Sequence, residues 1–170
     1  MNAEAAPWRA RHLVWLVALF FLALLPRLFS AQALGWNWDG PGSFTLVNFD
    51  EGGACRAALD GFKYSTFVGR QTIGIAALLS DAPPEGITGN APAVKAWCHS
   101  SGHILIARGY SAVTGALTSV LVAVMALLLV PAQPAVAWTA GALLALSGFH
   151  MSESQSGTVD VPSVFFIYAF

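Results

Sequence analysis

The sequence predicts an all-α integral membrane protein, a polytopic helix bundle with a large first extracytoplasmic loop that carries interfacial helices. Hydrophobic residues make up 56% of the 170 residues and charged residues only 10%, whereas about a quarter of the residues in a globular domain are charged. All eight lysines and arginines lie at or before Arg108, and the net charge is −1. The chain therefore lacks the basic stripe that nucleic acid requires, and residues 1–170 are expected to form a single membrane domain.

Three apolar stretches and the start of a fourth can be recognised. The first covers about residues 12–29 and reaches the roughly 17 residues that a span minimally needs. The second covers 104–130 and is long enough to cross with tilt. The third covers 135–151 and is rich in small residues, which let helices pack closely in lipid. The fourth, 161–170, is about half a crossing, which favours the N-terminal part of a longer protein.

The basic residues Arg9 and Arg11 precede the first stretch and favour a cytoplasmic N-terminus. Residues 30–103 then form one large loop outside. The first stretch could instead be a signal peptide, with the two arginines as its basic region and Ala31-Gln32-Ala33 as a small-x-small cleavage site. We favour the membrane anchor.

The large loop is rich in aromatic residues, which gather at membrane interfaces. Within it, Tyr64–Leu79 is predicted to be an interfacial helix or a short re-entrant segment, because its apolar residues are too few for a span and Arg70 lies inside it. The following stretch, Ser80–Pro92, contains the prolines, glycines and asparagine that are typical of turns.

The two cysteines, Cys55 and Cys98, both lie in this loop. In an oxidising compartment they could pair and close a loop of about 40 residues, a bridge worth roughly 3–4 kcal/mol. They could also be two unrelated buried thiols. A third alternative is a zinc site of the two cysteines with His99 and His103, although Gly102 makes a regular helix there doubtful.

Three acidic residues share one side of the membrane if the chain crosses three times: Asp50, Glu51 and Asp160. The adjacent pair could be solvated loop residues, or part of a tight, packed turn formed with the two glycines that follow. Asp160 precedes Val161 and Pro162, so it could also serve as a helix N-cap.

Three motifs in this order and spacing resemble one family. They are Phe49-Asp50-Glu51, the stretch "ARGYSAVTGALTSVLVAV" from Ala107 to Val124, and "SESQSGTVDVPSVFF" from Ser152 to Phe166. Together with the predicted topology, they resemble the N-terminal region of GT-C glycosyltransferases, the membrane enzymes that include protein O-mannosyltransferases and lipid A aminoarabinose transferases.

The resemblance implies transfer of a hexosyl or pentosyl group from a polyprenyl-phosphate sugar donor, with inversion, on the extracytoplasmic face of a bacterial inner (plasma) membrane. It implies that Asp50 is the base that takes the proton of the acceptor hydroxyl. Glu51 would position the acceptor or the loop. Asp160 would lie near the same cavity and help to bind a metal or the acceptor.

The leaving group in such a reaction is a lipid phosphate, which cationic side chains should neutralise. Arg108 matches a frequent family arginine, with Arg56 and Arg70 as further candidates. Arg108 could equally be an interfacial anchor with its head in water. The resemblance requires no cofactor, although some relatives use a divalent metal, which His150 and Glu153 could hold.

A rival interpretation is a non-catalytic transmembrane subunit or a transferase-like scaffold of a larger membrane complex. The small-residue faces of Gly115–Val130 and Ala140–Gly148 would suit docking of other membrane subunits. A transporter is less favoured, because the sequence shows no charge at the middle of a span.

Overall fold

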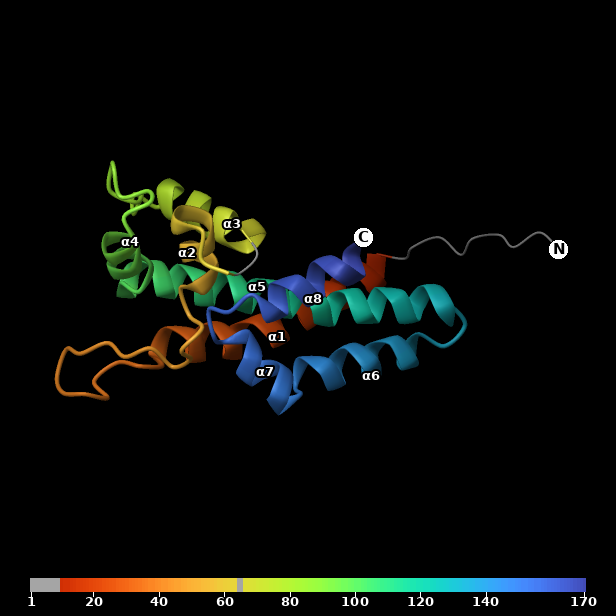
Figure 1. Ribbon diagram of the computed structural model, residues 1–170. Helices are drawn as coiled ribbons and strands as arrows, with labels where there is room; N and C mark the ends of the chain where they lie inside the picture. The colour runs from red at the N-terminus through yellow and green to blue at the C-terminus, as the bar shows by residue number, and fades with distance from the viewer. Residues whose placement is uncertain (1–9, 64–65) are drawn as a thin grey trace.

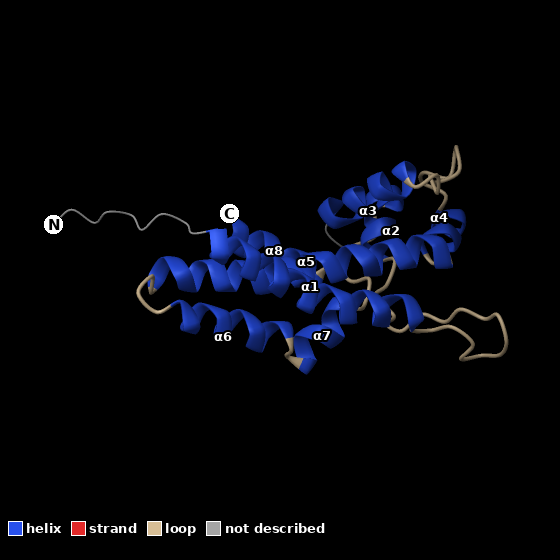
Figure 2. Cartoon of the chain, turned by 180° about the vertical axis from the view of Figure 1, so that it is seen from behind, coloured by secondary structure: helices blue, strands red, loops and turns tan. Residues whose placement is uncertain are grey.

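The computed structural model describes residues 10–63 and 66–170, which form helices joined by loops (Figures 1 and 2). The body contains two long helices, α1 (Ala10–Ala33) and α5 (Ser101–Leu129). Leu19 of α1 belongs to the same core as Ala123 of α5, while Leu34, just after α1, contacts Arg108. The two helices therefore run in opposite directions, and their shared core is aliphatic.

Both long helices are apolar and long enough to cross a membrane, and a third crossing is counted if a bent helix pair forms one span. The two long helices correspond to the first and second predicted spans. The helix α1 is longer than predicted at both ends, and α5 begins three residues earlier and ends one residue earlier than predicted. The last predicted stretch is the helix α8 (Asp160–Ala169), which packs along α5 (Figure 1).

The third predicted span, 135–151, corresponds to a bent helix pair and not to one continuous helix. It consists of α6 (Pro134–Ala145) and α7 (Gly148–Ser154), which meet at an angle of 57°. The Ser147 hydroxyl accepts a hydrogen bond from the backbone N–H of His150 at 3.5 Å and caps α7. The break leaves the last carbonyls of α6 without helical partners, and Arg27 of α1 bonds the Ala145 oxygen at 2.9 Å.

The large loop is folded into helices at one end of the long pair (Figure 1). It contains α2 (Gly53–Asp60), α3 (Thr66–Leu78) and α4 (Ala91–Cys98). The predicted loop helix is present as α3, although Tyr64, its expected first residue, lies outside the described residues. The predicted turn region ends earlier than expected, because Pro92 already belongs to α4, and neither α2 nor α4 was predicted.

Cys55 of α2 and Cys98 of α4 form a disulfide. The zinc alternative is therefore wrong, since both sulfur atoms are bonded to each other. The doubt about a helix at Gly102 is also wrong, because the Ser100 side chain caps α5 by accepting from the N–H of His103 at 3.3 Å. Around the bridge, Val94 and partly buried neighbours form a small second core.

The small residues of the helices are used for packing within the chain. A Cβ at Gly141 of α6 would lie 2.6 Å from a methyl group of Leu19 and 2.9 Å from Ala123. Gly115 of α5 lies directly against Ser154 and Val161 in the same way. The small-residue faces that were predicted to suit docking of another subunit therefore pack within the chain at these two glycines. Gly141 brings α6 against α1 and α5, and Gly115 brings α5 against α7 and α8.

Candidate functional site

A buried ion pair fixes the acidic turn of the large loop to α5. The Arg108 guanidinium donates to the two carboxylate oxygens of Glu51, from Nε at 2.7 Å and from Nη2 at 2.9 Å. Both side chains are fully buried. A bidentate contact of this kind restricts the relative orientation of the two side chains as well as the distance between them.

Glu51 also collects backbone groups from two distant segments. Its carboxylate accepts from the N–H of Gly157 at 3.1 Å and from the N–H of Val47 at 3.0 Å. Burial by itself would raise the pKa of Glu51, but the hydrogen bonds from Arg108, Gly157 and Val47 and the charge of Arg108 together lower the pKa below its ordinary value. The carboxylate therefore stays ionised and joins α5, the acidic turn and the segment before α8.

The structure gives Arg108 a role that differs from both sequence interpretations. Besides Glu51, it donates to the backbone oxygens of Leu34 at 2.7 Å and Ala31 at 3.4 Å, and it lies 5.1 Å from the centre of the Phe44 ring. Its head is not in water, so the interfacial anchor is wrong. Its donors are directed at groups of the same chain, so a phosphate contact would require this cluster to open.

The neighbouring residue, Asp50, is not part of this buried ion pair and lies at an open hollow. Asp50 lines an open hollow of about 410 Å³ at the acidic turn. The charged and polar residues that share this hollow are Glu51, Arg56, Lys63 and His99, and its aromatic residues are Phe49 and Phe62. The hollow therefore combines two acids, of which Glu51 is paired with Arg108, with two cations and an imidazole. Such a set can bind a phosphate and exchange a proton.

The walls of the hollow are positioned by α2 and α4. Arg56 forms an ion pair with Asp60, one turn along α2, at 3.5 Å, and its guanidinium carbon lies 4.1 Å from the centre of the Phe62 ring. The disulfide residues directly precede Arg56 and His99 in the sequence. The bridge thus fixes two lining residues of the hollow relative to each other.

His99 is held against the turn that follows the acids. Gly52 has a φ of 81°, and a Cβ there would lie 2.8 Å from the backbone oxygen of Cys98, so only glycine allows this close approach. Burial, together with the charges of Lys95 and Arg56, lowers the pKa of His99, against a smaller opposing effect of Glu51. The imidazole is therefore neutral at pH 7 and able to accept a proton.

Asp160 is brought to the same end of the molecule, but it does not line the hollow. It is exposed in the first turn of α8. The N-cap position belongs to Val159, whose side chain makes no capping hydrogen bond, so the prediction that Asp160 is the N-cap was wrong. Its carboxylate can still interact favourably with the N-terminus of α8. The contact between Glu51 and Gly157 is what places this segment beside the acidic turn.

The remaining predicted site residues lie elsewhere. Arg70 is exposed on α3 and does not line the hollow. His150 lies with Nδ1 2.9 Å from Nη2 of Arg27, so one of its ring nitrogens is already engaged, and Glu153 lies one turn further on α7. Within residues 10–63 and 66–170, no group of three or more His, Cys, Asp or Glu side chains is arranged to hold a metal ion.

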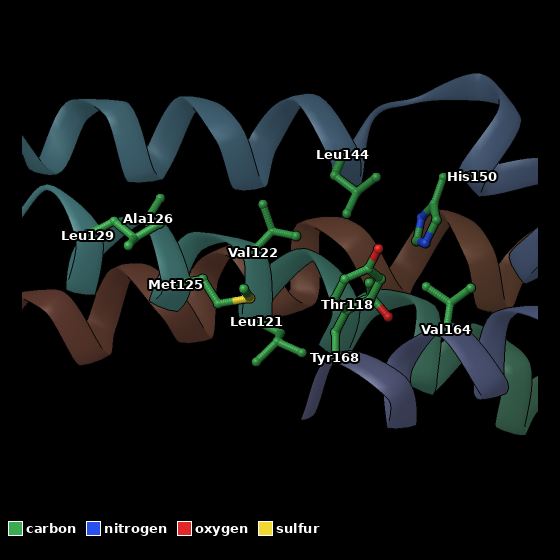
Figure 3. A pocket seen from close by; sticks show the side chains of 10 residues that line it. All are labelled: Thr118, Leu121, Val122, Met125, Ala126, Leu129, Leu144, His150, Val164 and Tyr168. Atoms are coloured by element: carbon green, nitrogen blue, oxygen red, sulfur yellow. The ribbon is translucent and has the colours of Figure 1, made fainter. Parts of the chain in front are cut away.

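A second, apolar pocket lies between α5, α6, α7 and α8 (Figure 3). It has a volume of about 470 Å³ and is lined mainly by aliphatic side chains of α5. His150 and Thr118 lie towards one end of it and Leu129 towards the other (Figure 3). This pocket is distinct from the polar hollow, which is formed by the loop.

Sequence reasoning missed Lys63 and His99 as lining residues of the polar hollow, and Gly157 as a partner of Glu51. The signal for His99 was its position next to Cys98, since a disulfide to Cys55 necessarily brings the neighbours of both cysteines together. No sequence signal indicated Gly157, because its contribution is a backbone N–H.

Comparison with family models, with curated proteins and with solved structures found no match to this chain.

Proposed function

We propose that this chain belongs to a GT-C type glycosyltransferase that moves a sugar from a polyprenyl-phosphate donor to an acceptor hydroxyl in the hollow around Asp50. The observation that carries the proposal is the grouping of Asp50 with Arg56, Lys63 and His99 in one hollow of about 410 Å³. The hollow lies at the end of the long apolar helices, where a lipid-linked substrate would present its head group.

The proposed topology has three crossings: α1, α5, and α6 with α7 as one bent span. In this arrangement, α8 begins a fourth span, and the N-terminus lies in the cytoplasm of a bacterium. The large loop then faces the extracytoplasmic side. Support comes from the length and apolar composition of these helices and from the contact that joins Glu51 to Gly157.

In the proposed reaction, the acceptor oxygen attacks the anomeric carbon from the side opposite the phosphate. Asp50 takes the proton of the hydroxyl as the new C–O bond forms. The bond between the anomeric carbon and the phosphate oxygen breaks, and the phosphate leaves with the electron pair. Arg56 and Lys63, which line the same hollow, neutralise its charge. The inner carboxylate, Glu51, positions the turn and does not react.

The test uses the full-length protein in liposomes with polyprenyl-phosphate mannose and a serine-containing peptide as acceptor, or with polyprenyl-phosphate aminoarabinose and lipid A as acceptor, and measures released polyprenyl phosphate. Asp50→Asn should lower turnover about 100-fold or more, the usual contribution of a general base. The matched control is Glu85→Gln, since Glu85 is an exposed acid outside the hollow. Retained turnover in Asp50→Asn would remove the base assignment, and release by neither donor would count against these sugars.

A role as a non-catalytic subunit has less support. Gly115 and Gly141, which that alternative would use to dock a partner, already pack against side chains of this chain.

A further inference from the structure

The apolar pocket of Figure 3 is lined at one end by His150, and Arg27 lies behind His150, outside the lining. Arg27 is fully buried, and its guanidinium donates to Ala23 and Ala145 oxygens and to Nδ1 of His150. Its Nε has no hydrogen-bond partner in the part of the chain that the structure describes. No ion pair joins Arg27 to an acid within the described residues. A buried positive charge without a counter-ion is costly, so the surroundings of Arg27, which include His150, favour an anion.

The bond from Arg27 determines the chemical state of His150. Since Arg27 can only donate, Nδ1 of His150 must be the acceptor, and the proton of the neutral ring is then on Nε2. Nε2 is buried and has no partner among the described groups. His150 therefore offers an N–H donor, backed by a positive charge, at one end of the pocket (Figure 3).

The rest of the pocket is suited to a hydrocarbon chain. Its aliphatic wall runs along α5 through Leu121, Val122, Met125 and Ala126 to Leu129. From Thr118 to Leu129 this is roughly 16 Å of helix, at about 1.5 Å per residue. In the proposed topology, Leu129 lies at the cytoplasmic end of α5, and His150 lies deeper in the bilayer, nearer to the outer surface than Leu129. A bound chain would therefore point from His150 towards the cytoplasmic surface.

We propose that this pocket binds a single-chain anionic amphiphile, with its carboxylate or phosphate head at His150 and its chain along α5. The site is separate from the hollow at Asp50 and does not depend on sugar transfer.

The test is photo-crosslinking of the full-length protein in phosphatidylcholine nanodiscs with hexadecanoate that carries a diazirine in its chain. Label should attach to α5 or α8 residues of the pocket. Unlabelled hexadecanoate or hexadecyl phosphate should compete at least about tenfold better than hexadecanol, because hydrogen bonds to charged groups are stronger than neutral ones. The better of the two anionic competitors identifies the head group.

Two variants and one control complete the design. His150→Phe removes the donor and should weaken labelling about tenfold, whereas His150→Gln retains both an acceptor for Arg27 and an N–H donor and should restore it. Ala126→Phe should block labelling by filling the pocket, without touching Arg27. Leu143→Phe changes an exposed α6 residue outside the pocket and should have no effect. Equal competition by hexadecanol, or labelling that survives Ala126→Phe, would overturn the proposal.

Discussion

Two buried arginines stabilise two regions of this chain by different means. In the loop region, Arg108 of α5 faces the carboxylate of Glu51 at 2.7 Å. At the break between α6 and α7, Arg27 of α1 bonds backbone oxygens and His150, and the described residues provide it with no acidic partner.

The difference shows what each region loses when its arginine is removed. Without Arg108, a buried carboxylate remains without its charge partner, which is among the most costly defects in a protein. Without Arg27, only neutral carbonyl groups and an imidazole lose a donor. The loop region should therefore be far more sensitive than the helix break, although both arginines are fully buried.

The largest expected effect is that of Arg108→Met. The substitution should destabilise the protein by about 3–5 kcal/mol, measured as the free energy of unfolding in mixed micelles with increasing SDS. The double variant with Glu51→Gln should recover part of the loss, because the remaining group is then uncharged. A cost below about 1 kcal/mol, the value typical of exposed pairs, would contradict a buried pair.

The second effect concerns the disulfide of the loop region, which spans 43 residues. Replacing Cys55 and Cys98 together by alanine should cost about 2–4 kcal/mol. Hydrogen exchange should accelerate in α2 and α4, which the bridge joins, and should remain unchanged in α6. Equal acceleration in α6 would show that the two regions unfold as one unit. Reduction of the wild-type protein provides the matched control.

A smaller effect is expected for Arg27→Met, about 1–3 kcal/mol, since it leaves buried carbonyls unsatisfied but no buried charge. Exchange should accelerate near the end of α6, where the Ala145 oxygen loses its donor. Arg27→Lys should retain part of the stability through its ammonium group. If Arg27→Met costs as much as Arg108→Met, the contrast between the two regions is wrong.

The smallest expected effect is that of acidification, which should destabilise the loop region more than the break between α6 and α7. The lowered pKa of Glu51 means that its contribution to stability is complete above the unfolded-state pKa of about 4.3 and is lost as the pH falls through the folded-state value. Stability should therefore decline below about pH 4.3, and less so in Glu51→Gln. Exchange in α6 near Arg27 should respond less, because no carboxylate of residues 10–63 and 66–170 pairs with that arginine. An unchanged profile in Glu51→Gln would assign the acid sensitivity to another group.

Much of the helical structure could be predicted because its signal is local. Composition and length were enough to recognise the apolar runs that form α1, α5 and α8. They also indicated the shorter run that forms α3. The break after Ala145 was not recognised, because it is stabilised by Arg27, 118 residues earlier in the chain. The doubt about Gly102 failed for a related reason, since a cap at Ser100 and packing of α5 outweigh the low helix propensity of one glycine.

The candidate site was predicted in part. The adjacent acids were recognised as unusual, but their sequence did not distinguish the inner carboxylate of Glu51 from the outer one of Asp50. Arg108 was expected at a phosphate, and the structure pairs it with Glu51, 57 residues away. Lys63 and His99 were not expected in the hollow, since only the disulfide and the packing of α2 and α4 bring them there.

The sequence by itself determined that the chain is helical and suited to lipid, because hydrophobicity and length act over neighbouring residues. Only the tertiary structure decided the partners of the charged groups. Glu51 could have faced water, and Arg108 a phosphate, in many arrangements of the same helices. Burial selected their pairing, since a charge removed from water must find a partner, and that partner can lie anywhere in the chain.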